Sequence, residues 1–156
     1  MIKLILSKSE NLDKNFFGVI SSLKGNIISV LSSKPYSIVK EKTNKICKSK
    51  QCLFLDTVAD SNYKDVVYLP AENLTSISIA INQAQQSFKG KATIVFDTIT
   101  NLAIKNDSSI LIKFFSFILS RSHEWSADLI FILPNEGVDE NLMSLIKQSS
   151  DKIEKK

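Results

Sequence analysis

The order of segments along the chain predicts an α/β domain with a mostly parallel sheet that is covered by helices on both faces. Two runs, Ala92–Phe96 and 128–133, are apolar without alternation, which is typical of strands that are buried on both sides. Strand-like and helix-like segments also alternate through most of the 156 residues. Such alternation is typical of parallel strands joined by crossover helices.

The first part of the chain begins this alternation. Residues 10–24 predict an amphipathic helix, since their apolar side chains fall on one helical face and Gly25 can end it. A short β-branched strand is predicted at 26–31. The turn Ser32–Pro35 predicts the start of a second helix that runs to about Lys48, because a serine side chain can cap first-turn N–H groups and proline fits the first helical position.

The rest of the chain continues the same pattern. The segment 108–124 is apolar on nearly every side and is therefore predicted to be a helix buried on more than one side. The other predicted elements are strands at 52–55 and 65–69, a helix from Asn73 or Thr75 to Gly90, a helix at about 138–148, and a short polar tail at 151–156.

Composition is that of a globular protein, with 44% apolar and 23% charged residues. We expect one domain over 1–156, with a core at about 26–153 preceded by the helix at 10–24. No apolar run reaches membrane-spanning length, and the opening residues become polar too soon for a signal peptide. A cytoplasmic protein without membrane contact is therefore expected.

The chain offers few side chains for catalysis or metal binding. Cys47 and Cys52 are the only cysteines and His123 is the only histidine, so neither a zinc site nor a disulfide framework is expected. The two cysteines are predicted to be reduced and buried, and His123 is predicted to lie at a helix C-terminus. No G-x-S-x-G motif occurs. We expect no catalytic residue and no metal.

Several stretches together resemble the KaiC-like branch of the RecA ATPase superfamily, in particular archaeal members that lack the Walker A phosphate loop. The stretches that carry the resemblance are 74–81, 94–102, 113–119 and 151–153. The resemblance implies a three-layer RecA-like domain. It also implies side-by-side assembly, since RecA-like relatives commonly form oligomers.

In active relatives the turn after the first strand reads G-x-x-x-x-G-K-[ST], in which glycines let backbone N–H groups converge on phosphate. Laid onto 32–39, the two glycine positions hold Ser32 and Ser37, and the lysine and hydroxyl positions hold Ile38 and Val39. Pro35 has no N–H to donate. The resemblance therefore implies a degenerate loop.

Other polar residues at predicted strand ends complete the candidate site. Lys34 takes the lysine position only in a gapped alignment, and no glycine lies between Gly25 and Gly90 to let the backbone wrap a phosphate. Asp97 matches the Walker B aspartate, which positions Mg²⁺ in active members. Asp97 and Asp56 are expected to cap turns instead. The vestigial nucleotide site is predicted to comprise Ser32, Ser33, Lys34, Ser37 and Asp97, with Asp56 and Thr98 as further polar residues at strand ends.

Three functions are compatible with this sequence. The first is a non-catalytic pseudo-ATPase that acts as a regulatory or protein-interaction module without a cofactor, through a partner protein or self-association. The second is an atypical ATPase that binds ATP and Mg²⁺ through Lys34 and Asp97. The third is a nucleic-acid-binding accessory domain related to recombinases, suggested by the isoelectric point of about 9.0 and by the resemblance to the RecA superfamily. The lysines cluster at 42–50 and 152–156, where they can complement helix C-termini, and lack interleaved aromatic residues.

Overall fold

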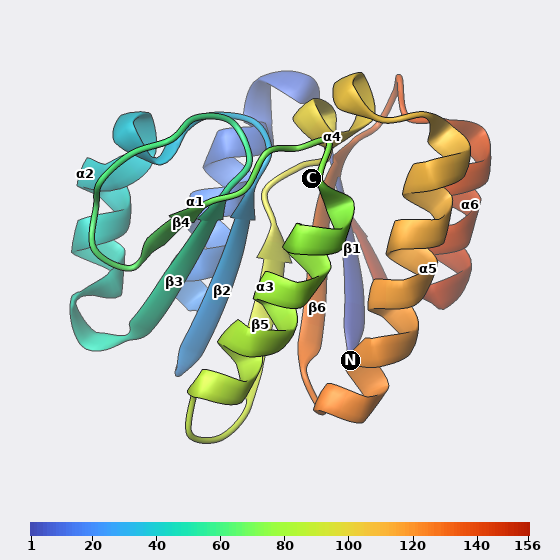
Figure 1. Ribbon diagram of the computed structural model, residues 1–156. Coiled ribbons are helices and arrows are strands. Elements are labelled where there is room, and N and C mark those ends of the chain that lie inside the picture. The colour runs from blue at the N-terminus through green and yellow to red at the C-terminus, as the bar shows by residue number, and fades with distance from the viewer.

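The computed structural model describes all 156 residues as one parallel sheet of seven strands between two layers of helices (Figure 1). The strands are β1 (Ile2–Ser7), β2 (Asn26–Leu31), β3 (Gln51–Asp56), β4 (Val66–Tyr68), β5 (Ala92–Phe96), β6 (Asp128–Pro134) and β7 (Lys152–Lys155). The helices are α1 (Leu12–Ser22), α2 (Tyr36–Ile46), α3 (Leu74–Ser87), α4 (Thr100–Lys105), α5 (Ser108–Trp125) and α6 (Glu140–Ser149). The predicted three-layer α/β class is confirmed.

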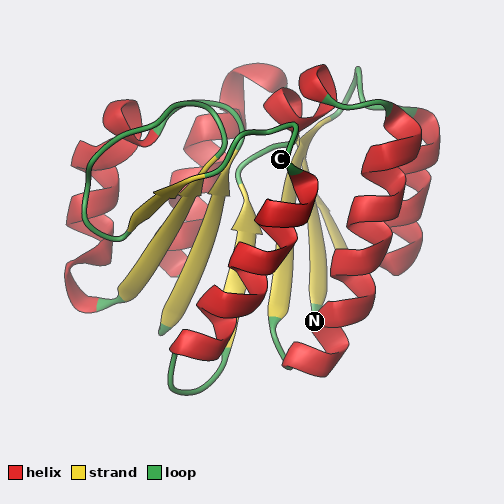
Figure 2. Cartoon of the chain, in the orientation of Figure 1, coloured by secondary structure: helices red, strands yellow, loops and turns green.

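The strands lie in the order β4-β3-β2-β5-β6-β1-β7, and every neighbouring pair is parallel. The alternation of strand and helix explains this arrangement, since each parallel pair needs a crossover connection. Helices α3 and α5 lie in front of the sheet in Figure 2, and α1 and α2 lie behind it. None of the helices is both long and apolar enough to cross a membrane.

Both faces of the central strands are buried, as the unbroken apolar runs predicted. In β6, Leu129, Phe131 and Leu133 belong to the core beneath α3 and α5, whereas Ile130 and Ile132 belong to the core beneath α1 and α2. The same two-residue period holds in the other central strands, because successive side chains of a strand point to opposite faces. The sheet therefore has a separate hydrophobic core on each side.

The core begins earlier and the sheet ends later than the sequence predicted. Strand β1 lies between β6 and β7, so the expected start of the core at residue 26 is wrong. The predicted polar tail is also wrong, because residues 152–155 form β7 along the exposed edge of β1. The N–H of Asp151 donates to the Ile2 carbonyl at 2.7 Å, and that of Lys156 donates to the Leu6 carbonyl at 2.8 Å. Lysine and glutamate are typical of edge strands.

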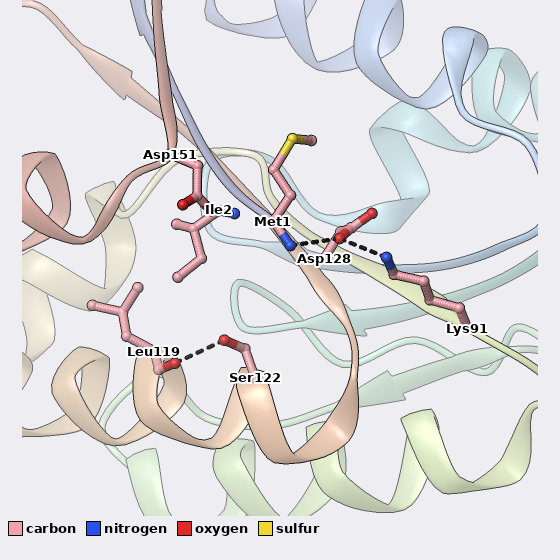
Figure 3. Close-up of polar contacts among 7 residues, drawn as sticks. All are labelled: Met1, Ile2, Lys91, Leu119, Ser122, Asp128 and Asp151. Carbon is pink, nitrogen blue, oxygen red and sulfur yellow. Dashed lines mark hydrogen bonds and ion pairs between the residues drawn. The ribbon is translucent and has the colours of Figure 1, made fainter.

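The amino end of β1 is held by charged groups (Figure 3). The amino group of Met1 lies 2.8 Å from Asp128 Oδ1, and Lys91 Nζ lies 3.0 Å from the same oxygen. Burial raises the pKa of Asp128, but hydrogen bonds from these two cations outweigh it and leave the pKa below its usual value. The N–H of Ile2 donates to Asp151 Oδ2 at 2.7 Å. These contacts join the first strand to the last two.

The two cysteines differ from the prediction. Cys47, in the 3₁₀ turn Cys47–Ser49 after α2, and Cys52, in β3, form a disulfide with their Cα atoms 6.1 Å apart. Both residues are half-buried. The expectation of two reduced, buried thiols is therefore wrong, because the helix-to-strand connection folds back and brings the two side chains together.

Candidate functional site

The candidate site lies where β2 and β5 end side by side. The chain leaves β2 toward α2 behind the sheet and leaves β5 toward α4 and α5 on the other side. In open parallel sheets, ligands bind beyond the carboxyl ends of the strands at such a switch of direction. The residues that follow these strands are Ser32 and Ser33 after β2, and Asp97 and Thr98 after β5.

Asp97 binds the backbone of the turn that follows β2. Its Oδ1 accepts a hydrogen bond from the N–H of Ser32 at 2.7 Å, and its Oδ2 accepts one from the N–H of Ser33 at 3.3 Å. Two consecutive N–H groups of this kind are the donors with which a phosphate loop holds its anion. In this protein they hold a carboxylate of the chain itself.

Burial changes the proton affinity of this carboxyl group. Asp97 is only 6% exposed. Burial raises its pKa from 3.8 to about 7, although hydrogen bonds from three backbone N–H groups oppose the change. The carboxylate of Asp13, in the first turn of α1, contributes a further small increase.

Asp56 plays a similar part at the end of β3. Its Oδ2 accepts from the N–H of Tyr36, the first residue of α2, at 2.8 Å. Its Oδ1 accepts from the N–H groups of Val58 and Ala59 at 2.9 and 3.2 Å. The predicted serine cap of this helix is therefore wrong, since Asp56 from the neighbouring strand binds the free amide. Both oxygens of Asp56 are occupied, which agrees with the turn-capping interpretation.

The side chain of Ser32 joins the same network to α4, a short helix that the sequence did not predict. Its Oγ accepts from the N–H groups of Asn101 and Leu102 at 3.0 and 3.2 Å. The Asn101 side chain in turn donates to the Thr57 carbonyl at 2.8 Å. The ends of β2 and β3 and the start of α4 are thus fastened together.

Replacing Ser32 with alanine is expected to lower the free energy of unfolding by about 1–3 kcal/mol, because buried amides lose an acceptor. The lower part of that range is expected, since the Asn101 N–H also donates to the Ser32 carbonyl at 3.0 Å. Urea denaturation measures the effect. Ser33→Ala is the matched control, since the Ser33 side chain makes none of these contacts, and equal losses in both variants would contradict the assignment.

The remaining predicted residues do not join this network. Lys34 Nζ pairs with Asp13 of α1 on the surface. Ser37 is exposed in the first turn of α2. Thr98 is buried, with its Oγ1 3.4 Å from Thr100 Oγ1. His123 is exposed in the last turn of α5, at the helix end where the sequence placed it.

The position of the degenerate loop needs a correction. The alignment onto 32–39 requires 26–31 to be the first strand, but the first strand is β1 and 26–31 is β2. Taken from the residue after β1, the motif covers 8–15, with Lys8 and Asp13 at the glycine positions. Lys14 and Asn15 then stand at the lysine and hydroxyl positions. A prediction of Ile2–Ser7 as a strand would have placed the comparison with the motif at this turn.

The turn after β1 is as poor in phosphate donors as the turn after β2. It contains no glycine, Lys14 is exposed on α1, and the Asn15 side chain donates to Ser7 Oγ at 2.7 Å. A cavity of about 210 Å³ opens beside it, below the ~300 Å³ of ordinary ligand pockets. Its lining residues are Lys8, Ser9, Glu10, Asn135 and Glu136.

A larger cavity of about 430 Å³ lies nearby, at the ends of β5 and β6. Its lining includes Leu111 of α5, Val138 before α6, and Ile104 of α4, which is 72% exposed. Its one carboxylate, Asp139, is already bound to the N–H of Leu142 at 3.0 Å as the cap of α6. This cavity suits an apolar side chain better than a phosphate.

No protein-family model and no curated protein matches the chain. The KaiC-like relationship therefore stays a prediction.

Proposed function

We propose that this chain is a non-catalytic RecA-like domain that acts as a regulatory or protein-interaction module. The observation that carries the proposal is the pairing of Asp97 with the N–H groups of Ser32 and Ser33. An incoming phosphate would have to displace a buried carboxylate and would meet its negative charge whenever Asp97 is ionised.

The other anion-binding positions support the same conclusion. The first amide of α2 is bound to Asp56, and Lys34 is paired with Asp13. Beside β1, the small cavity carries the carboxylates of Glu10 and Glu136, which repel phosphate. Lys34 and Asp97, the two groups that the atypical ATPase was expected to use, are thus both engaged within the chain.

The apolar cavity at the ends of β5 and β6 supports the interaction part of the proposal. Ile104 projects beside it, and Ile110 and Phe117 of α5 are also about half-exposed. Exposed apolar side chains and an apolar cavity are features of surfaces that contact another protein. A partner protein or a second copy of the chain would bury them.

The nucleic-acid alternative has less support, because many lysines already have partners. Lys50 Nζ lies 2.6 and 2.9 Å from the carbonyls of Ile20 and Ser21 at the end of α1. Lys152 in β7 and Lys156, the residue after this strand, both pair with Glu154. Basic side chains held in this way complement helix ends and neighbouring carboxylates.

Titration calorimetry with Mg-ATP tests the proposal. At about 1 mM Mg-ATP, the upper end of ordinary substrate constants, we expect no saturable heat. Saturable binding would overturn the proposal if Asp97→Ala or Lys14→Gln abolished it and Lys105→Gln left it intact. The variant that abolishes binding would then show which loop holds the nucleotide. Lys105 ends α4 and serves as a matched loss of one charge.

A further inference from the structure

A cavity of about 520 Å³ lies at the opposite end of the sheet from the candidate site. It opens where α2 ends and β3 begins, and the segment before β4 forms another wall. Its volume falls within the range of small-molecule pockets, about 300–1,000 Å³. Tyr36 is the one residue that lines this cavity and also contacts the candidate site, because its N–H donates to Asp56.

Both cysteines line this cavity. They are half-buried, and so the disulfide is within reach of a small molecule that enters. Their sequence separation is five, which makes a very short ring. The stabilisation from a disulfide grows with the length of the loop that it closes, so a ring of this size contributes least to holding a fold together.

Opening the ring is expected to leave the sheet intact, because the start of β3 has ladder contacts of its own. Cys52 is paired with Ile27 in the parallel ladder of β2 and β3, and most of the buried core residues lie on other strands and on the helices. The bond joins only the 3₁₀ turn after α2 to the start of β3. Its cleavage and formation are therefore local events that a folded molecule can undergo.

The cavity that the disulfide lines carries two lysines and one carboxylate. Lys50, between the two cysteines in sequence, lines the cavity, and its ammonium group is fixed by the carbonyls of Ile20 and Ser21. Lys64, which is exposed, is the second cation in the lining, and Asp65 is its one carboxylate. A nearby cation stabilises a thiolate, which makes it a better leaving group. Lys64, whose ammonium group makes no ion pair, also attracts a ligand with carboxylates.

We propose that the Cys47–Cys52 disulfide is a thiol–disulfide exchange site for a small thiol that carries carboxylates, and that exchange occurs in the folded protein. The thiolate of the small molecule attacks one cysteine sulfur, the bond between the two Sγ atoms breaks, and the other cysteine leaves as a thiolate. A second thiol then attacks the mixed disulfide and releases the oxidised small molecule. Two thiols supply the two electrons and two protons that appear on Cys47 and Cys52.

The test follows reduction of the oxidised protein by glutathione and, separately, by cysteamine, a thiol of opposite charge. Samples are quenched in acid and alkylated, and mass spectrometry counts the free thiols while circular dichroism follows folding. We expect two thiols to appear in the folded protein at a rate proportional to thiolate concentration. With oxidised glutathione, Cys52→Ser should trap one glutathione adduct, and Cys47→Ser/Cys52→Ser none.

Variants test the charge preference. Lys64→Gln is expected to lower the rate constant for glutathione divided by that for cysteamine by about threefold. A change of this size corresponds to the free energy of one exposed ion pair. Lys105→Gln, which removes a lysine that does not line the cavity, should leave the ratio unchanged. Reduction only after unfolding, free thiols in the air-equilibrated protein, or the same ratio in Lys64→Gln would overturn the proposal. None of these results depends on whether the domain binds nucleotides.

Discussion

The free energy of unfolding is expected to fall by up to about 4 kcal/mol between pH 4 and pH 8 because of Asp97 alone, at 1.36 kcal/mol for each unit of pKa change. The pKa of Asp97 is raised from 3.8 to about 7 in the folded protein. Between these values the folded state holds a proton that the unfolded state has released. The free energy of unfolding therefore decreases as the pH rises toward 7, and above pH 7 Asp97 lowers it no further. Urea denaturation at a series of pH values measures the slope.

Asp97→Asn provides the control. An amide cannot ionise, so the variant should lose the part of the slope that Asp97 contributes. Its oxygen can still accept from one of the N–H groups of Ser32 and Ser33, but its NH₂ group then faces the other, so lower stability than the original protein at pH 5 is expected. Measurements from pH 5 to 8 avoid Asp128 and Glu154, whose pKa values are lowered. Parallel curves for both proteins would contradict the assignment.

Phe131→Ala is expected to lower the free energy of unfolding by about 3–5 kcal/mol, the usual cost of removing a buried phenylalanine. Phe131 is fully buried at the centre of β6. Its ring stacks on Phe96 at a centroid distance of 5.1 Å and meets Phe115 edge-on at 5.7 Å. The substitution removes both aromatic contacts and leaves a cavity between β5, β6 and α5.

Phe117→Ala is the matched control for that experiment, and both variants are compared by urea denaturation. Phe117 lies on the same helix as Phe115 but is 47% exposed. Its loss should change stability by no more than about 0.5 kcal/mol, as for most surface substitutions. If both variants lost the same stability, the assignment of the rings of Phe96, Phe115 and Phe131 to the centre of the core would be wrong.

The architecture could be predicted from local patterns, because β5 and β6 are apolar on both faces and Asn73 caps α3 as its residue type indicated. Strand β1 carries a similar signal, with Leu4 and Ile5 buried on opposite faces, but no turn precedes it to mark a strand. Strand β7 carries no such signal. Its lysines and glutamate form a strand because β1 offers an unpaired edge.

The candidate site could be predicted only as separate parts. Asp97 and Ser32 each follow an apolar run, and so each was identifiable as a polar residue at a strand end. Their contact joins residues 65 positions apart and requires β2 and β5 to be neighbours, which the alternation of strands and helices does not specify. The disulfide could not be predicted for a similar reason. A separation of five residues does not show whether the connection between α2 and β3 folds back and brings the two cysteines together.

The place of β1 between β6 and β7 governs how the polypeptide acquires its structure during translation. Residues 2–7 are synthesised before the other strands, yet their ladder partners are residues 129–134 and 152–155. The nascent chain must therefore keep this largely apolar segment without its β-pairing until residues 129–134 have been made. Contacts of such long sequence separation slow folding, so this side of the sheet is expected to form late, and loss of residues 2–7 or 152–155 removes strands from the same side of the sheet.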